Sequence, residues 1–198
     1  MNHAGLKIIR RASFAAVPWK NGGGLTREAI RVPPTGEPFL WRVSVAHIEV
    51  SGPFSDFAGY ERKMALLQGR GIELQFAGGE QRCLRGVGDY VEFDGGTPTH
   101  CNLLDGPCVD LNLMVAKSLR SAVRLERLSG RLAIAANRGE TILIFAIQDP
   151  LSLDCSGESA RLEPWDLAIL SDCRARLSTL TSDPVSAPST VFIATISH

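Results

Sequence analysis

Turn signals built on glycine and proline recur along this chain at roughly eight- to twelve-residue intervals, a spacing typical of a β-sandwich or barrel. They separate short apolar segments such as Lys63–Leu67, Ile72–Phe76, Tyr90–Phe93 and Val109–Val115. Residues 1–115 contain no long apolar stripe at helical spacing. We therefore predict an all-β fold. A chain of 198 residues can bury roughly 70% of its unfolded surface, as one large domain or two small ones.

The second half of the chain repeats this pattern less regularly. Leu132–Ala135, Thr141–Ile147, Asp166–Leu170 and Val191–Ser197 are again predicted to be strands separated by turns. Between the halves, Ala116–Leu128 fits either a helix or a strand, and we interpret it as a linker followed by a strand. The sequence thus indicates a second β unit that repeats the pattern of the first in a degenerate form.

The stretch Pro18–Glu28 combines a flexible backbone with many reactive side chains. Three successive glycines, Gly22–Gly24, precede Leu25–Val32, which alternates like a half-buried strand. The polar groups of the stretch are Lys20, Asn21, Thr26, Arg27 and Glu28. One interpretation is a hairpin turn with solvated charges. The other is a ligand site, in which the glycine backbone and the basic side chains would hold a carboxylate or phosphate.

Two predicted strands each carry polar side chains on one face. In Trp41–Val50, Arg42 and Ser44 lie opposite the apolar side chains, and in Asp110–Val115 the residues Asp110 and Asn112 share a face. Both faces of such a strand would be enclosed in a barrel, so these polar groups need partners. Two interpretations are open: the polar groups line a ligand cavity, or Asp110 and Arg42 form a structural pair.

Charge and composition exclude several classes of partner. Lys and Arg number 21, as do Asp and Glu, which gives a formal net charge of zero and disfavours binding to nucleic acid or an anionic membrane. The longest apolar runs, such as Ile142–Ile147, are far shorter than the roughly 20 residues that cross a bilayer. The N-terminus lacks the pattern of a secretory signal. We expect a soluble, cytoplasmic protein.

Familiar catalytic and metal motifs do not assemble. The five cysteines contain no Cys-x-x-Cys pair, and there are four histidines, so a disulfide framework or a zinc knuckle is not expected. The chain lacks a Gly-x-Ser-x-Gly elbow and the Gly-Lys-Ser/Thr of a P-loop. The glycine run also precedes a strand, whereas a dinucleotide fingerprint opens a helix.

The stretch Pro-Trp-Lys-Asn-Gly-Gly-Gly-Leu-Thr-Arg-Glu at 18–28 closely resembles the HutD/Ves family of bacterial proteins associated with histidine utilisation. Further segments are similar in the same order, namely Trp41–Ala46, Gly52–Ser55, Leu66–Gly69, Phe93–Gly96 and Gly106–Met114. The resemblance implies a bicupin of two jelly-roll barrels. We expect the first barrel, with the ligand pocket, at residues 1–115 and a second, degenerate barrel at 116–198.

The metal-binding motifs of cupins are not matched. In the first motif, the positions of two histidines and a glutamate hold Ala58, Tyr60 and Met64. In the second, His100 is one residue out of register, which turns a strand side chain to the opposite face. His47 and His100 without a placed carboxylate would form a poor site. We therefore predict that the protein holds no metal and no other cofactor.

The resemblance favours the ligand-cavity interpretation and a metal-independent binding protein, regulatory or buffering in histidine utilisation. The expected ligand is a small anionic metabolite such as urocanate or formylglutamate. An isomerase or lyase using Glu28, Lys20 or Tyr60 is the alternative, and a ligand-free interaction module is a third. No nucleic acid or membrane partner is expected, whereas a homodimer is compatible with the sequence. The predicted ligand-binding residues are Lys20, Asn21, Thr26, Glu28, Arg42, Ser44, Asp110 and Asn112.

Overall fold

A computed structural model describes residues 5–19, 24–36, 38–155, 157–179 and 188–197, with backbone only for residue 174 and residues 176–179. The prediction of an all-β fold is confirmed, because these residues form strands and a single 3-10 turn, η1 (Arg11–Ser13). None of the helical structure described is long and apolar enough to cross a membrane. By their contacts, the residues divide into two units, 14–118 and 1–13 with 119–198.

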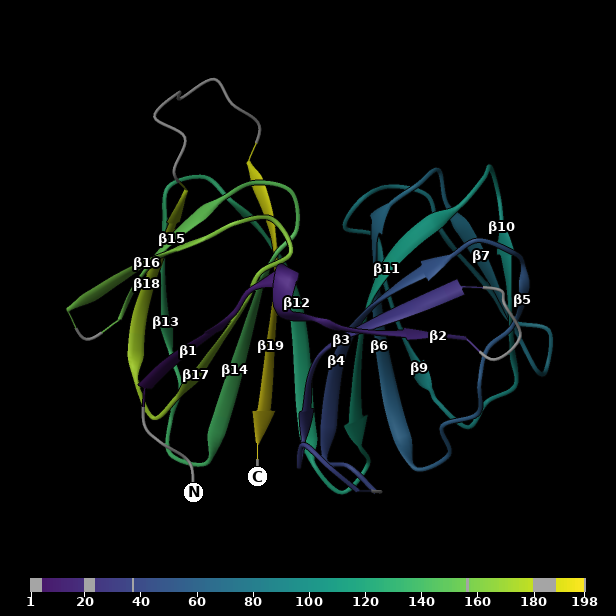
Figure 1. The fold of residues 1–198 in the computed structure, drawn as a ribbon, viewed down its shortest axis with the longest axis horizontal. Helices are drawn as coiled ribbons and strands as arrows, with labels where there is room; N and C mark the ends of the chain where they lie inside the picture. Colours follow the sequence, from purple (N-terminus) through teal and green to yellow (C-terminus); the bar gives the residue numbers. More distant parts are fainter. Residues whose placement is uncertain (1–4, 20–23, 37, 156, 180–187, 198) are drawn as a thin grey trace. The chain divides into compact units, whose positions relative to one another are not determined.

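The unit of residues 14–118 consists of two antiparallel sheets. The larger has the strand order β2-β3-β4-β11-β6-β9 and the smaller β5-β10-β7-β8 (Figure 1). The strands are β2 (Ala15–Pro18), β3 (Gly24–Val32), β4 (Trp41–Ile48), β5 (Gly52–Pro53), β6 (Tyr60–Gln68), β7 (Ile72–Phe76), β8 (Gln81–Leu84), β9 (Tyr90–Asp94), β10 (Thr99–Leu103) and β11 (Cys108–Ala116).

The core of this unit lies between its two sheets. Met64 and Leu66 of the larger sheet pack with Ile72 and Leu74 of the smaller one, and all four are fully buried. Period-two alternation explains the arrangement, because Met64 and Leu66 leave β6 on the same face. Arg62 precedes them on that face and is also buried. This inward-facing arginine is a central part of the site described below.

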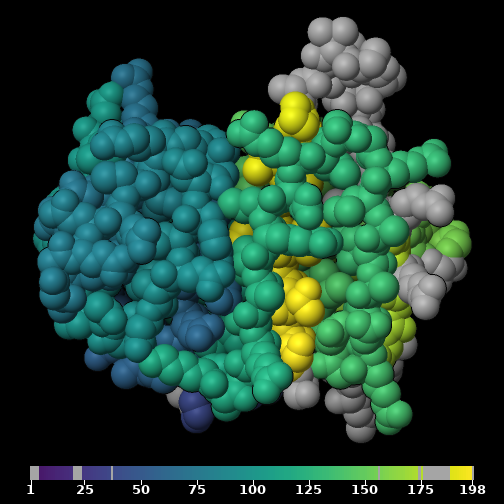
Figure 2. All heavy atoms as spheres, turned by 180° about the vertical axis from the view of Figure 1, so that it is seen from behind, coloured from purple at the N-terminus to yellow at the C-terminus, as the bar shows by residue number. Residues whose placement is uncertain are grey.

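The second unit has the same two-layer design. Its sheets have the orders β1-β17-β14-β19-β12 and β13-β18-β15-β16. The strands are β1 (Gly5–Ile9), β12 (Arg120–Leu128), β13 (Arg131–Ala135), β14 (Glu140–Ala146), β15 (Leu151–Cys155), β16 (Glu158–Leu162), β17 (Leu167–Ser171), β18 (Arg174–Thr179) and β19 (Ser189–Ser197). Figure 2 shows the yellow atoms of β19 among green atoms of the same unit, as expected for a strand hydrogen-bonded to both β12 and β14.

The N-terminal strand differs from the expected division of the chain. We expected residues 1–115 to form the first barrel, but β1 pairs along its whole length with β17, from Gly5 opposite Ser171 to Ile9 opposite Leu167 (Figure 1). Leu6 and Ile8 pack against the core of the second unit. Strand β1 therefore belongs to the unit that contains residues 119–198.

Asp166 fastens the segment after β1 to the same unit. Its buried carboxylate accepts hydrogen bonds from Arg10 Nη1 at 2.6 Å, the Arg11 backbone N–H at 2.9 Å and the Glu163 backbone N–H at 3.0 Å. The chain leaves β1 at this point and turns through η1. The Asp166 carboxylate thus links the segment that follows β1 to the segment that precedes β17, although the two are far apart in sequence.

Replacing Asp166 with asparagine should lower the free energy of unfolding by about 1–3 kcal/mol, because the amide cannot accept all three bonds and leaves a buried donor unpaired. Chemical denaturation measures this loss. The matched control is Asp105→Asn, since the Asp105 side chain is 62% exposed in its ion pair with Arg70 and such pairs contribute about 0–1 kcal/mol. Equal effects of the two substitutions would contradict the assigned role.

Candidate functional site

Four neighbouring strands of the larger sheet turn polar side chains toward one cavity. The register sets Arg42 and Arg62 on either side of Met114, and Ser44 and Met64 on either side of Asn112. The next row places Ala46 and Leu66 on either side of Asp110. Because side chains alternate along each strand, all three rows face the same way.

A β-bulge adds one more arginine to this face. On β3, Glu28 is opposite Ser44 and Ile30 is opposite Val43, so Ala29 is the extra residue. Without the bulge, strict alternation would direct Arg31 away from Glu28. The inserted residue reverses the alternation, as bulges do where a side chain must be re-aimed. Thr26, Glu28 and Arg31 therefore all line the cavity.

The cavity has a volume of about 520 Å³. Six of the eight predicted ligand-binding residues line it, namely Thr26, Glu28, Arg42, Ser44, Asp110 and Asn112. The other two, Lys20 and Asn21, lie outside the described residues. The remaining lining residues are Val17, Pro18, Trp19, Arg31, Ala46, Pro53, Phe54, Ser55, Phe57, Arg62 and Met114. The structure thus brings three separated segments of sequence to one site.

A chain of hydrogen bonds runs along the floor of the cavity. Arg62 donates to Asn112 Oδ1 from Nε at 3.2 Å and from Nη2 at 3.0 Å, and Asn112 Nδ2 donates to Asp110 Oδ1 at 2.6 Å. The expected alternative of a direct Asp110–Arg42 pair is therefore not the arrangement found. Asp110 contacts an amide, and the arginine linked to it is Arg62.

Burial shifts the pKa of both charged ends of this chain. Burial raises the pKa of Asp110 to about 7, although the charge of Arg62 and the hydrogen bond from Asn112 oppose the rise. Burial also lowers the pKa of Arg62 to about 10, against the favourable charge of Asp110. Arg62 therefore remains a cation at neutral pH, while Asp110 is close to its midpoint.

Aromatic rings enclose the Arg62 guanidinium. Its Cζ lies 4.7 Å from the ring centre of Phe54, 5.0 Å from that of Phe93 and 5.9 Å from that of Phe57. Such contacts stabilise a cation and keep its plane fixed. They do not neutralise its charge. Among the described residues, its side-chain hydrogen bonds all go to the neutral Asn112.

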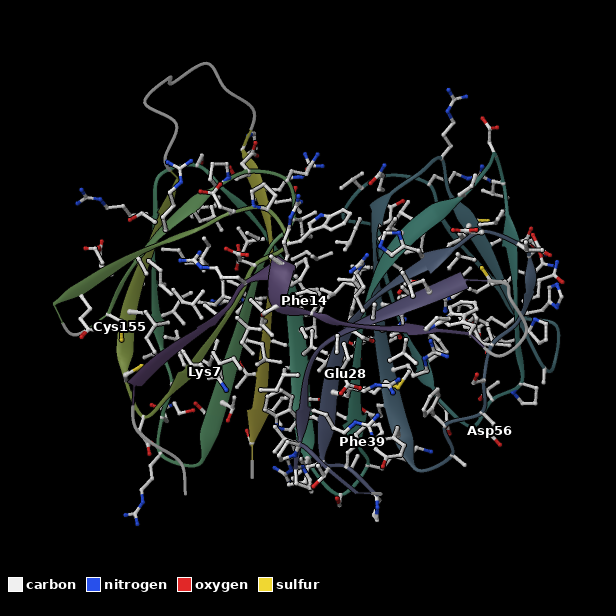
Figure 3. All side chains as sticks on the ribbon, viewed as in Figure 1. Lys7, Phe14, Glu28, Phe39, Asp56 and Cys155 are labelled. Carbon is white, nitrogen blue, oxygen red and sulfur yellow. The ribbon has the colours of Figure 1, made fainter. Side chains whose placement is uncertain are left out.

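A second cationic group forms around Glu28. Its carboxylate lies 3.1 Å from Arg31 Nη2 and 3.9 Å from Arg42 Nη1. Both guanidinium groups also lie over the ring of Phe39, at 5.3 and 5.4 Å from its centre. Glu28 and Phe39 are labelled in Figure 3. Arg42 additionally donates to Met114 Sδ at 3.2 Å. Glu28 thus positions two arginines beside the cavity.

The last glycine of the 22–24 run has a steric role. A Cβ on Gly24 would collide with the carbonyl oxygen of His47 and lie 3.1 Å from the Trp19 ring. That ring donates from Nε1 to Thr26 Oγ1 at 2.7 Å. Close approach of backbone and indole therefore explains Gly24, whereas Gly22 and Gly23 lie outside the described residues.

Sequence reasoning missed Arg62 and Arg31, although a signal for Arg62 was present. Arg62 stands two residues before Met64 and four before Leu66, so alternation places it on their inward face. Our predicted strand began at Lys63 and left it out. Arg31 carried no comparable signal, because a bulge leaves no mark in the pattern of residue types. Both arginines line the cavity.

The three positions that hold ligands in metal-binding cupins carry no such groups here. Met64 is fully buried in the core, and Tyr60 packs on Phe39, whose backbone N–H donates to its hydroxyl at 3.0 Å. Within the described ranges, no group of three or more His, Cys, Asp or Glu side chains could hold a metal ion. Absence of a metal from the isolated protein stays a prediction.

Solved structures define the class of protein. A conserved protein of unknown function from Pseudomonas aeruginosa PAO1 has a TM-score of 0.83 at 31% identity, covering 98% of each chain. HutD from Pseudomonas fluorescens SBW25 has a TM-score of 0.79 at 29% identity, covering 98% of this chain and 100% of that one. Bacillus subtilis oxalate decarboxylase has a TM-score of 0.67 at 8% identity, over 100% of this chain and 78% of that one. The fold is a cupin β-fold.

Sequence comparison places the chain within that class. The HutD family model matches residues 11–186, and the protein belongs to the HutD family. The "Uncharacterized 21.2 kDa protein in hutC 3'region" of Pseudomonas putida is 37% identical over 163 residues, 81% of this chain and 84% of that protein. Protein Ves of Escherichia fergusonii is 34% identical over 109 residues, 54% of this chain and 56% of that protein.

Proposed function

We propose that the cavity binds a small anionic metabolite and that the protein has a regulatory or buffering role in histidine utilisation. The observation that carries this proposal is the charge of the cavity. Three arginines and two carboxylates are among its described lining residues, so one positive charge is in excess when both carboxylates are ionised. A ligand carboxylate would compensate that charge through charge-assisted hydrogen bonds.

Of the three arginines, buried Arg62 argues most strongly for an anionic ligand. Arg62 is only 5% exposed, and a cation is costly to bury without a directly paired anion. Neither the amide of Asn112 nor the phenyl rings supply a counter-charge. A bound carboxylate would supply it, while the rings would contact the apolar part of the ligand.

The proposed ligand class is urocanate-like or formylglutamate-like. It is supported by family membership and by the names of two relatives, one called HutD and the other assigned to the region 3' of hutC. Calorimetric titration with urocanate and formylglutamate tests it directly, with urocanamide as an uncharged comparison. Binding of the acids but not of the amide supports the proposal, and equal binding of acid and amide would contradict it.

Replacing Arg42 with alanine should weaken binding of these acids at least about tenfold, because a charge-assisted contact of about 1.5–3 kcal/mol is lost. The measurement is a calorimetric titration accompanied by a melting curve. Arg70→Ala is the matched control, since it removes an equal charge from a side chain that is 78% exposed and outside the cavity. A folded Arg42→Ala variant with unchanged affinity would rule out the assigned role.

One observation favours a second candidate, a metal-independent isomerase or lyase. A carboxyl group with a pKa of about 7, as at Asp110, can accept and return a proton at neutral pH. Of the acid–base groups expected from the sequence, Glu28 is held by two arginines and Tyr60 is not part of the cavity lining. Nuclear magnetic resonance of urocanate or formylglutamate incubated with the protein would show new signals if turnover occurs. Unchanged spectra would argue for binding alone.

A further inference from the structure

The hydrogen bonds around Asn112 determine its orientation. Two donors of Arg62 meet Asn112 Oδ1, so the other end of the amide, Nδ2, must be the group that meets Asp110. Because Nδ2 is a donor, Asp110 Oδ1 is used as an acceptor. A proton bound by Asp110 is therefore carried on Oδ2.

Asp110 lines the cavity, and its Oδ2 is a buried atom with an unmet hydrogen-bonding requirement. Asp110 is only 1% exposed and lines the cavity. Within the described part of the chain, Oδ2 has no hydrogen-bond partner. A buried carboxylate oxygen in this state is costly. Either a ligand donates a hydrogen bond to it, or the oxygen is protonated and itself donates to a ligand.

Charged groups around Asp110 come from each neighbouring strand. The charge of Arg62 acts on it from β6, and Arg42 of β4 and Glu28 of β3 line the same cavity. From β10, Cys101 interacts with it as a neutral thiol, because burial raises the pKa of Cys101 to about 12. In the free protein the charge of Arg62 and the hydrogen bond from Asn112 oppose the rise in the pKa of Asp110 and hold it partly ionised. An anion beside Arg62 would cancel part of this effect and favour the neutral carboxyl.

We propose that the cavity takes up its anion together with one proton, which is held on Asp110 Oδ2 and donated in a hydrogen bond to an oxygen of the ligand. This inference rests on the proposed function and adds to it the protonation state of the complex. It also narrows the ligand class. The group that reaches Asp110 must be a hydrogen-bond acceptor, such as a carboxylate oxygen, since an N–H donor would keep Asp110 ionised.

Proton uptake makes affinity depend on pH in a defined direction. Below the pKa of about 7 in the free protein, Asp110 already carries the proton and binding requires none. Above it, each anion must bring a proton from solution. The dissociation constant should then rise about tenfold per pH unit, until the pH reaches the higher pKa of Asp110 in the complex.

Formylglutamate is the appropriate probe, because its carboxylates are ionised and nothing else in it titrates near neutral pH. Calorimetry at about pH 8 in two buffers of different ionisation enthalpy counts the protons taken up, and the expected value approaches one per ligand. In Asp110→Asn the amide Nδ2 still donates into the cavity but cannot titrate. This variant should show no uptake, a dissociation constant that is constant between about pH 7 and 9, and tighter binding than the natural protein at the upper end.

Glu28→Gln is the matched control. It removes a negative charge from the same cavity without altering Asp110, so proton uptake should persist. Formylglutamate binding without uptake in the natural protein, or uptake that persists in a folded Asp110→Asn variant, would overturn proton coupling and leave the proposed function standing. Absence of formylglutamate and urocanate binding across this pH range would overturn both.

Discussion

Replacing Arg62 with alanine is expected to lower the free energy of unfolding by about 2–5 kcal/mol, because buried polar groups lose their hydrogen-bond partner and a buried side chain is truncated. The substitution leaves Asn112 Oδ1 without its donors and Asp110 without the cation linked to it. It also leaves a space between the phenyl rings that surround the guanidinium. Urea denaturation near neutral pH measures the change.

Anion binding should be lost in the same variant. Arg82→Ala is the control, because that side chain is 62% exposed in a surface ion pair and its loss should change stability by less than about 1 kcal/mol. A loss at Arg62 as small as the loss at Arg82 would show that the buried guanidinium is not needed for folding. Unchanged affinity in a folded variant would show that Arg62 does not contribute to anion binding.

Replacing Gly69 with alanine is expected to lower the free energy of unfolding by about 2–5 kcal/mol. Gly69 follows β6 with φ of 110°, and an added Cβ would lie 2.9 Å from both Cys108 Cα and the Pro107 carbonyl oxygen. Backbone strain accounts for about 1–2 kcal/mol and overpacking for about 1–3 kcal/mol. Because β6 carries Arg62, ligand affinity should fall as well.

Gly78→Ala separates the two contributions. Gly78 has a similar φ of 99°, but a Cβ there would meet nothing within 4 Å. Only the backbone cost of about 1–2 kcal/mol is expected at this position. Denaturation of both variants under one set of conditions gives the difference. If Gly69→Ala costs no more than Gly78→Ala, the close contact with Cys108 does not constrain the turn.

Regular alternation of residue types made most of the cavity predictable. Arg42 and Ser44 on one strand, and Asp110 and Asn112 on another, point inward as their spacing indicates. Which strands are neighbours does not follow from spacing. The partner of Asp110 could therefore not be chosen correctly between Arg42 and Arg62, because both flank Met114 at the same level of the sheet.

Deviations from regular pairing set the limit of prediction. The extra residue Ala29 turns Arg31 toward the cavity, yet no residue type in β3 marks it. The pairing of β1 with β17 is likewise hidden, because Leu6, Ile8 and Ile9 suit any edge strand. Local sequence specifies that a strand forms, whereas its partner is decided by long-range packing.

The place of β1 beside β17 has a consequence for biosynthesis. β1 leaves the ribosome before the other described strands, but its partner, Leu167–Ser171, is made only after a delay of roughly 10–30 s at ordinary elongation rates. Residues 14–118 are complete well before then and contain every described residue of the cavity. The nascent chain should therefore form the cavity early, while β1 stays unpaired until Leu167–Ser171 has been made.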